Sequence, residues 1–281
     1  RIFYQDFIYS SSGGLYDPSL YSSGARIDQF IDPYYSISSE APGDTIKELS
    51  MTMTSTDVTV ETRRLKAKWT DEVEQDLRAY FGMEMDSLMV QNLGDEIARE
   101  VDQSGIDVLV AGATAGNTNW SETPSGTYST LDPKVYAGTL WDAMIDSDQL
   151  VWEARNRNTT WIIAGATDVN RLRKLGPHKI TGGPSGPSSG RSALEFQGLL
   201  DERWEIWQAR HFPANTMLLG YRGTDFSDTG AVHSPYLPLE VKDAVKQLEG
   251  ESAFKTVRGV QWRGKTHVVN GDCFSKVTIT A

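Results

Sequence analysis

The sequence contains a single cysteine, Cys273, among its 281 residues. One cysteine cannot form an internal disulfide, so we expect either a reducing compartment or a protein that is stable without disulfides. No apolar run approaches the roughly 20 residues that a membrane-spanning helix needs, and no charged-then-apolar signal segment leads the chain. These absences predict a soluble, cytosolic protein without membrane contacts.

Positive charge is also scarce. The chain carries 27 basic and 38 acidic residues, which gives a formal net charge of -11. The molecule as a whole should repel phosphate backbones and anionic membranes, so any basic patch has to act locally. The length is sufficient for one large domain or two modest ones.

Motifs for cofactors and metals are missing. The four histidines lie far apart, and none shares a short metal-ligand spacing with another histidine or with the cysteine. There is no P-loop, no GxGxxG after a strand and no EF-hand loop. We therefore predict no cofactor and no metal.

Two patterns resemble catalytic sites. Residues 186–190 (GPSSG) fit G-x-S-x-G with Ser188 in the nucleophile position, but a nucleophile elbow needs a buried strand before the serine, and this one lies in a Pro/Gly/Ser loop. Trp204 and Trp207 could stack on a sugar beside two carboxylates. Their spacing of three places them on opposite faces of a strand, so at least one is expected in the core.

The N-terminal part of the chain is rich in aromatic residues. Residues 1–45 contain many Tyr, Phe, Ser, Gly and Pro residues and show no helical period. Disordered tails are normally poor in aromatic residues, so an ordered, extended arm that lies on another surface is favoured over a disordered tail. Residues 45–69 alternate and are rich in β-branched residues, which predicts a β-hairpin or a pair of long strands with a turn near residues 55–57.

Four basic residues then lie close together, at Arg63, Arg64, Lys66 and Lys68. The next 37 residues, 71–107, contain eleven acidic and only two basic residues. The basic strand is therefore predicted to contact acidic helices of this subunit or of a neighbour. The alternative is a solvated, charged strand, because exposed ion pairs often contribute only about 0 to 1 kcal/mol.

The acidic region has the signals of two helices. Thr70 stands at an N-cap position before two acidic residues, and Gly82 is the expected C-cap. A second helix is predicted from near Asp86 to about Val110. We interpret residues 112–129 as a loop, 137–155 and 168–175 as helices, and 159–166 as a buried strand. Further strands are expected within residues 201–210, 215–223, 230–239, 256–271 and 274–280, so the fold class is α+β.

From about Thr59 to Thr280 the chain resembles the major capsid proteins of tailed phages that share the HK97 fold, in particular the T-even-type myovirus branch. The resemblance rests on the order of three stretches. The first is TRRLKAKWTDEVEQDLRAYFGMEMDSLMVQNLGDEIAREVD, and the second is GTLWDAMIDSDQLVWEARNRNTTWIIAGATDVNRLRKL. The third is NTMLLGYRGTDFSDTGAVHSPYLPL, followed by FKTVRGVQW.

The resemblance implies a domain plan. It comprises an N-terminal arm, an extended E-loop, a peripheral domain with a long spine helix, an axial domain and C-terminal strands that return to the peripheral domain. The arm would comprise residues 1–27, the E-loop 28–66, the peripheral domain 67–136, the axial domain 137–255 and the C-terminal strands 256–281. In this branch a maturation protease removes an N-terminal segment, which would account for a chain that starts at Arg1.

The resemblance also implies a structural function without enzymatic activity. The protein would assemble into hexamers, with or without pentamers, of an icosahedral virion shell that is built in the host cytoplasm and encloses double-stranded DNA without sequence-specific binding. Scaffold, maturation protease, portal, vertex and decoration proteins would be partners. The candidates for contacts between subunits are Phe3, Tyr4, Phe7 and Tyr9 in the arm and Arg63, Arg64, Lys66 and Lys68 in the basic strand. The alternatives are a paralogous vertex protein, an encapsulin-type shell protein and, more remotely, a serine or glycoside hydrolase.

Overall fold

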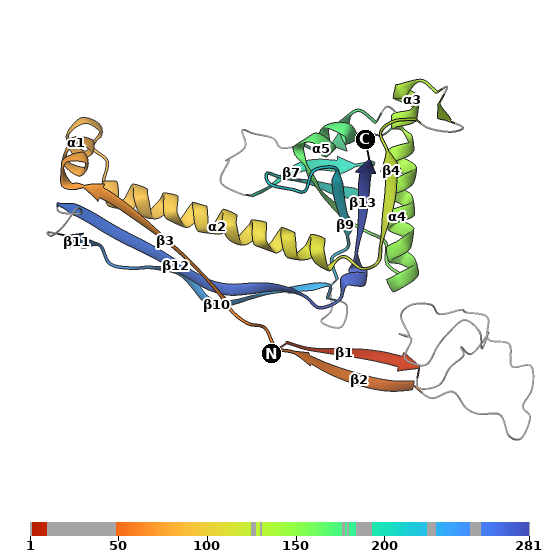
Figure 1. Cartoon of the computed structure of the whole chain (residues 1–281), viewed down its shortest axis with the longest axis horizontal. Coiled ribbons are helices and arrows are strands. Elements are labelled where there is room, and N and C mark those ends of the chain that lie inside the picture. Colours follow the sequence, from red (N-terminus) through yellow and green to blue (C-terminus); the bar gives the residue numbers. More distant parts are fainter. Residues whose placement is uncertain are drawn as a thin grey trace, which may run out of the picture.

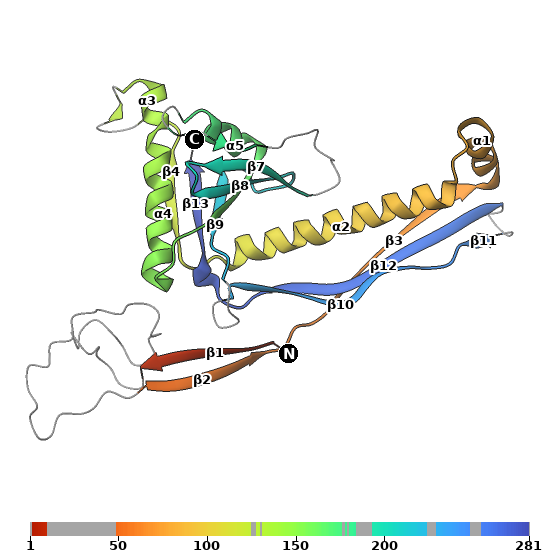
Figure 2. The same ribbon diagram turned by 180° about the vertical axis from the view of Figure 1, so that it is seen from behind.

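The computed structural model describes residues 2–9, 49–124, 128–129, 131–175, 178, 180–183, 193–223, 229–247 and 254–280. For residues 2–9 and 49–56 it describes the course of the backbone. The molecule is elongated (Figure 1). A long helix and a narrow sheet form one part, a second sheet with its own helices lies at one end of that helix, and a two-stranded ribbon projects separately, as the view from behind also shows (Figure 2).

The projecting ribbon consists of β1 (Ile2–Tyr9) and β2 (Leu49–Thr56), paired antiparallel with Ile2 opposite Thr56. The prediction of two strands within residues 45–69 is correct, but the hairpin alternative is wrong. The two strands β2 and β3 (Glu61–Thr70) pair with different partners, since β2 binds β1 and β3 binds β12 (Lys255–Val268). Pairing partners distant in sequence decide this arrangement, and local alternation cannot reveal them.

The two predicted acidic helices are present. In α1 (Asp71–Phe81), Oγ1 of Thr70 accepts a hydrogen bond from the Val73 backbone N–H at 3.4 Å, and Gly82 ends the helix in the left-handed conformation, with a φ of 64°. The next helix, α2 (Met85–Gly112), has 28 residues, which corresponds to a length of about 42 Å at 1.5 Å per residue. The predicted N-cap Thr70 and C-cap Gly82 of α1 are thus confirmed.

A four-stranded sheet lies along α2. Its central strand is β12, with β10 (Ala231–Val241) and β11 (Val245–Gln247) on one edge and β3 on the other. Leu93 and Ile97 of α2 pack against Val260 and Trp262 of β12. The helix therefore covers one face of this sheet.

The seven-stranded sheet makes up most of the second part. Its order is β4 (Gly116–Ser121), β13 (Phe274–Thr280), β9 (Thr216–Gly220), β5 (Trp161–Gly165), β8 (Trp204–Ala209), β7 (Leu194–Leu200) and β6 (Ile180–Thr181). The helices here are α3 (Pro133–Ala137), α4 (Thr139–Arg155) and α5 (Ala166–Arg173). One core contains Leu140 of α4 and Val169 of α5, and a second contains Leu218 of β9 with Ile106 near the end of α2. The helix α2 thus extends from the core of the four-stranded sheet into a core of the seven-stranded sheet.

The strand pairing divides the chain differently from the boundaries expected from the sequence. We interpreted residues 112–129 as a loop, yet β4 lies within them and pairs in parallel with β13. Residues 256–281 were expected to return to one sheet, but β12 joins the four-stranded sheet and β13 the seven-stranded one. The 3-10 turn at Gly271–Cys273, capped by the side chain of Asn270, separates these two strands and redirects the chain.

Candidate subunit-contact surfaces

The basic strand β3 presents its charges on two different faces. Arg63 is half-buried and forms an ion pair with Glu100 of α2. Arg64, Lys66 and Lys68 are exposed, and because they alternate with Arg63 along the strand they lie on the sheet face that α2 does not cover. We call Arg64, Lys66 and Lys68 the basic strip. The predicted contact with an acidic helix is thus made within the subunit by Arg63.

Neighbouring polar groups around the basic strip are already paired. Opposite the strip, β12 contributes Gln261, which donates to Glu240 at 2.7 Å. Further along β12, Nε of Arg263 donates to Thr62 at 3.0 Å. Within the part of the chain that the structure describes, the side chains of Arg64 and Lys66 have no such partner. Their positive charge therefore faces outward.

The acidic helix α1 also faces outward. None of its residues, all of which the structure describes, is buried. Two of its acids bind within the subunit: Glu74 accepts a hydrogen bond from Nε1 of Trp69 at 3.2 Å, and Asp71 accepts one from Oγ1 of Thr256 at 3.3 Å. Glu72 and Asp76 are exposed and, among the described residues, have no ion-pair partner.

The end of the molecule that carries α1 exposes large apolar side chains. The most exposed is Tyr80, at 80% of its full area. The others in this region are Val73, Phe81, Met83, Val245 and Phe254. The backbone N–H of Asp71 donates to the carbonyl of Phe254 at 3.2 Å, so the loop before β12 and the start of α1 lie together. Exposed apolar groups gathered at one end are typical of a surface that another protein covers.

The four predicted arm residues all lie in β1. In its register with β2, Phe3, Tyr4, Phe7 and Tyr9 stand opposite Ser55, Thr54, Met51 and Leu49. This places the aromatic positions on the projecting ribbon. That they contact neighbouring subunits stays a prediction.

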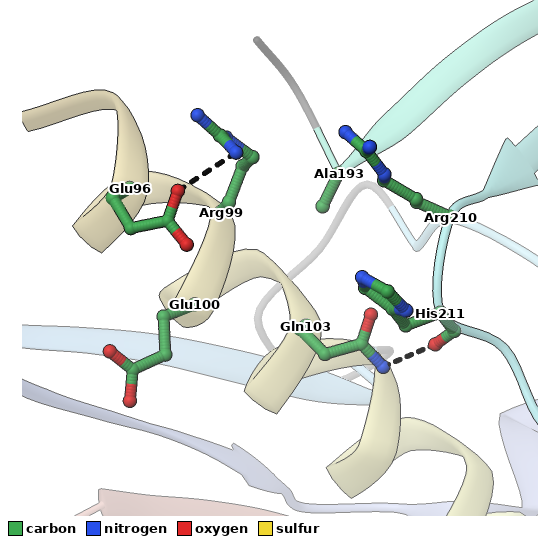
Figure 3. A pocket seen from close by; sticks show the side chains of 7 residues that line it. All are labelled: Glu96, Arg99, Glu100, Gln103, Ala193, Arg210 and His211. Atoms are coloured by element: carbon green, nitrogen blue, oxygen red, sulfur yellow. Dashed lines mark hydrogen bonds and ion pairs between the residues drawn. The ribbon is translucent and has the colours of Figure 1, made fainter. Parts of the chain in front are cut away.

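A pocket of about 380 Å³ lies at the junction of α2 with the second sheet. Figure 3 shows Glu96 paired with Arg99 along α2, at 2.8 Å, and the amide of Gln103 directed at the backbone carbonyl of His211 in the segment after β8. Arg210 completes the rim. Sequence reasoning missed this junction because its residues come from segments about 100 positions apart. The contacts join α2 to the second sheet.

Two carboxyl groups have a raised pKa: Asp168, which is buried, and Asp102, whose side chain is more exposed. Burial raises the pKa of Asp168 in α5, and the hydrogen bond and charge of Arg171 oppose this effect. Arg171 also binds Glu122 at 2.7 Å and Asn215 at 2.9 Å. Burial likewise raises the pKa of Asp102 in α2, against a hydrogen bond from the Ala193 backbone. Asp168 and Arg171 link α5 to Glu122 and Asn215, and Asp102 links α2 to the backbone at Ala193.

Of the two catalytic look-alikes, the structure describes the tryptophan pair. Ser188 lies outside the described residues. Trp204 is fully buried in the core that contains Leu140 and Val169, whereas Trp207 packs against the core that contains Leu218 and Ile106, so the prediction of opposite faces is confirmed. Among the residues with a described placement, no group of three or more His, Cys, Asp or Glu could hold a metal. No helix in the described ranges is long and apolar enough to cross a membrane.

Known protein structures share this fold. The capsid of Myoviridae phage XM1 matches with a TM-score of 0.55 and 13% identity, over 99% of this chain and 86% of that chain. The capsid of an empty GTA particle matches with a TM-score of 0.52 and 8% identity, over 100% of this chain and 86% of that chain. At such identities the likeness shows the fold alone, and it confirms the predicted α+β capsid fold of the HK97 type.

Sequence comparison adds the family. The major capsid protein of Enterobacteria phage T4 is 25% identical over 222 residues, and that of Vibrio phage KVP40 is 24% identical over 233 residues. The alignments cover 72% and 76% of this chain but 42% and 45% of those proteins, so the chain spans less than half the length of these curated relatives. The family model described as Major capsid protein Gp23 matches residues 15–270. The chain therefore belongs to the Major capsid protein Gp23 family.

Proposed function

We propose that this protein is the structural subunit of the icosahedral head shell of a tailed phage, and that it acts by self-association. The observation that carries this proposal is the family match, which extends over residues 15–270. The exposed surfaces described above support it. An isolated subunit leaves α1 without a buried residue and leaves aromatic groups at the end of the molecule in water.

Assembly of such a subunit needs no chemical step. Identical copies that contact each other through two different surfaces form closed rings, here hexamers with or without pentamers, and further contacts between rings close the shell. Apolar side chains that are exposed in one subunit become buried between copies, at about 25 cal/mol for each Å² of apolar surface. Many weak contacts repeated over a shell make it stable.

The parts of the molecule suggest a division of roles. We assign α2 and the four-stranded sheet to the peripheral domain and the seven-stranded sheet to the axial domain, near the axis of the ring. The β1–β2 ribbon would contain the N-terminal arm and part of the E-loop. Compared with the boundaries from the sequence, β3, β10 and β11 move to the peripheral domain and β4 and β13 to the axial one, because strands of one sheet belong together.

The remaining partners follow from the proposed role. A head shell is assembled in the host cytoplasm with a scaffold, processed by a maturation protease, and completed by portal, vertex and decoration proteins. It encloses double-stranded DNA without reading its sequence. The net charge of -11 suits this contact, since a strongly basic subunit would hold the incoming DNA.

Negative-stain microscopy of the purified protein tests the proposal. The chain should be expressed with any segment that its gene encodes before Arg1 and, in parallel, with a scaffold protein. Rings, tubes or shells built from five- or six-membered units are expected. Particles built from pentamers alone would favour a vertex protein, and particles that enclose enzymes would favour a compartment. Dispersed single subunits under all conditions would contradict the proposal.

A further inference from the structure

Arg64 and Lys66 on β3 and the outer acids of α1 have no ion-pair partner within the part of the subunit that the structure describes. Arg64 and Lys66 face away from α2, and Glu72 and Asp76 face away from the rest of their own subunit, with no ion-pair partner among the described residues. The two surfaces carry opposite charge. The inner side of α1 is fixed by the bonds of Glu74 to Trp69 and of Asp71 to Thr256, so α1 cannot turn its outer acids toward β3 of the same subunit without breaking these bonds.

The spacing of the charges on the two surfaces agrees. Glu72, Asp76 and Tyr80 follow one another at four-residue steps on α1, so they form a row with about 6 Å between neighbours. Arg64, Lys66 and Lys68 follow at two-residue steps on β3, which gives about 6.6 Å. Two rows of nearly equal spacing can pair along their length. Whichever direction the helix takes along the strand, Asp76 at the centre of one row meets Lys66 at the centre of the other.

The ends of the two rows are also compatible. Glu72 would meet one of the outer cations, and the ring of Tyr80, which is 80% exposed, would meet the other, where a cation over the ring is attracted to it. On the strand side, Gly259 lies next to Lys66 across the sheet, and it leaves room above the strip because it has no side chain.

We propose that α1 of one subunit docks on the basic strip of β3 in a second copy of the same chain, with Asp76 opposite Lys66. This inference rests on the proposed self-assembly and names a contact that orients one subunit against the next. Because the two surfaces differ, the contact is head-to-tail and can be repeated around a ring. A net charge of -11 makes like subunits repel each other, so a local pairing of opposite charge also sets which surfaces meet.

Charge reversal tests the contact. In K66E the centre of the strip becomes acidic opposite Asp76, and in D76K the centre of the helix row becomes basic opposite Lys66. Each variant alone should need about tenfold more protein to reach half-assembly, because like charges now face each other. Lys174→Glu, at an exposed lysine next to α5, is the matched control and should assemble at the wild-type concentration. Circular dichroism of unassembled protein checks that each variant is folded.

Mixing the two variants distinguishes a contact between subunits from a defect within one. In an alternating arrangement Glu at position 66 of K66E meets Lys at position 76 of D76K, and the unchanged strip of D76K meets the unchanged helix of K66E. In a ring of six every contact is then complementary, so an equal mixture should form hexamers within about threefold of the wild-type concentration. A folding defect in either variant would not be rescued in this way.

The other outcomes are equally informative. If K66E and D76K each assemble like the wild type, or if folded variants fail both alone and mixed, the docking is wrong while the proposed function stands. If K66E instead loses salt-sensitive binding to duplex DNA and assembles normally, the strip is a DNA contact and the docking is likewise wrong. If the wild-type chain does not assemble at all, the proposed function fails, and the docking fails with it.

Discussion

Nε1 of Trp204 donates a hydrogen bond to Oγ1 of Thr159 at 2.9 Å, deep in the core of the seven-stranded sheet. Both residues are almost completely buried. The hydroxyl of Thr159 in turn donates to Asp148 of α4 at 2.6 Å. The tryptophan that a sugar-binding hypothesis would place at a surface therefore serves as part of a polar link between β8, the start of β5 and α4.

Replacing Thr159 by Val should destabilise the fold. The substitution keeps the shape of the side chain but leaves the buried Trp204 N–H without an acceptor, which costs about 1 to 3 kcal/mol of the free energy of unfolding. Urea unfolding of the unassembled chain measures the change. Thr160→Val, at the exposed neighbouring position, is the control and should change stability by less than about 0.5 kcal/mol. Equal stabilities of the two variants would show that the link contributes nothing.

Two glycines of α2 should respond to alanine in opposite directions. A Cβ at Gly112 would lie 2.6 Å from Cγ2 of Val268, so G112A should cost about 1 to 3 kcal/mol through overpacking. A Cβ at Gly105 would meet Oγ1 of Thr266 at an ordinary 3.6 Å, so G105A should stabilise the helix by up to about 1 kcal/mol. Thermal unfolding of both variants gives the comparison. A stabilising G112A would contradict the close packing of α2 on β12.

Asp168 should make stability depend on pH. Its folded-state pKa is raised, chiefly by burial, so the folded chain holds the proton more tightly than the unfolded chain does. The free energy of unfolding should therefore fall as the pH rises from the ordinary aspartate pKa of about 4 through the raised pKa of Asp168 in the folded chain. Asp168→Asn cannot ionise and should lose this part of the slope. Unfolding curves of the two proteins over this pH range test it, and parallel pH profiles would argue against the assignment.

Removal of residues 1–10 should weaken shells more than capsomers. The deletion takes away β1 with Phe3, Tyr4, Phe7 and Tyr9 and leaves β2 without its partner strand. If these residues lie on neighbouring subunits, the shells should melt at a lower temperature while rings still form. Calorimetry of intact and truncated shells is the measurement. Shells of equal thermal stability would count decisively against an arm that binds neighbours.

Local signals in the sequence predicted local structure well. Thr70 and Gly82 fixed the two ends of α1 because capping depends on residues within one turn of the helix. The strand β4 was missed because its residues, GNTNWS, have the composition of a turn. It is a strand because β13, about 160 positions later, pairs with it, and such a contact overrides local preference.

The candidate surfaces could be predicted only in part, because their charges are visible in the sequence but their faces depend on the fold. The cluster of Arg63, Arg64, Lys66 and Lys68 next to an acidic helix was visible in the sequence. Alternation along a strand implies two faces, but only the structure shows that Arg63 meets Glu100 while Arg64 and Lys66 face outward. The exposed apolar end depends on how α1, β11 and the loop before β12 come together, so no single segment could reveal it.

The most direct test of the central claim is sedimentation velocity of the full chain over a wide range of concentration, with and without a scaffold protein. A self-assembling shell subunit should shift from the 31.2 kDa monomer to species of five or six copies and then to much larger closed particles. A single 31.2 kDa species at every concentration would contradict the account.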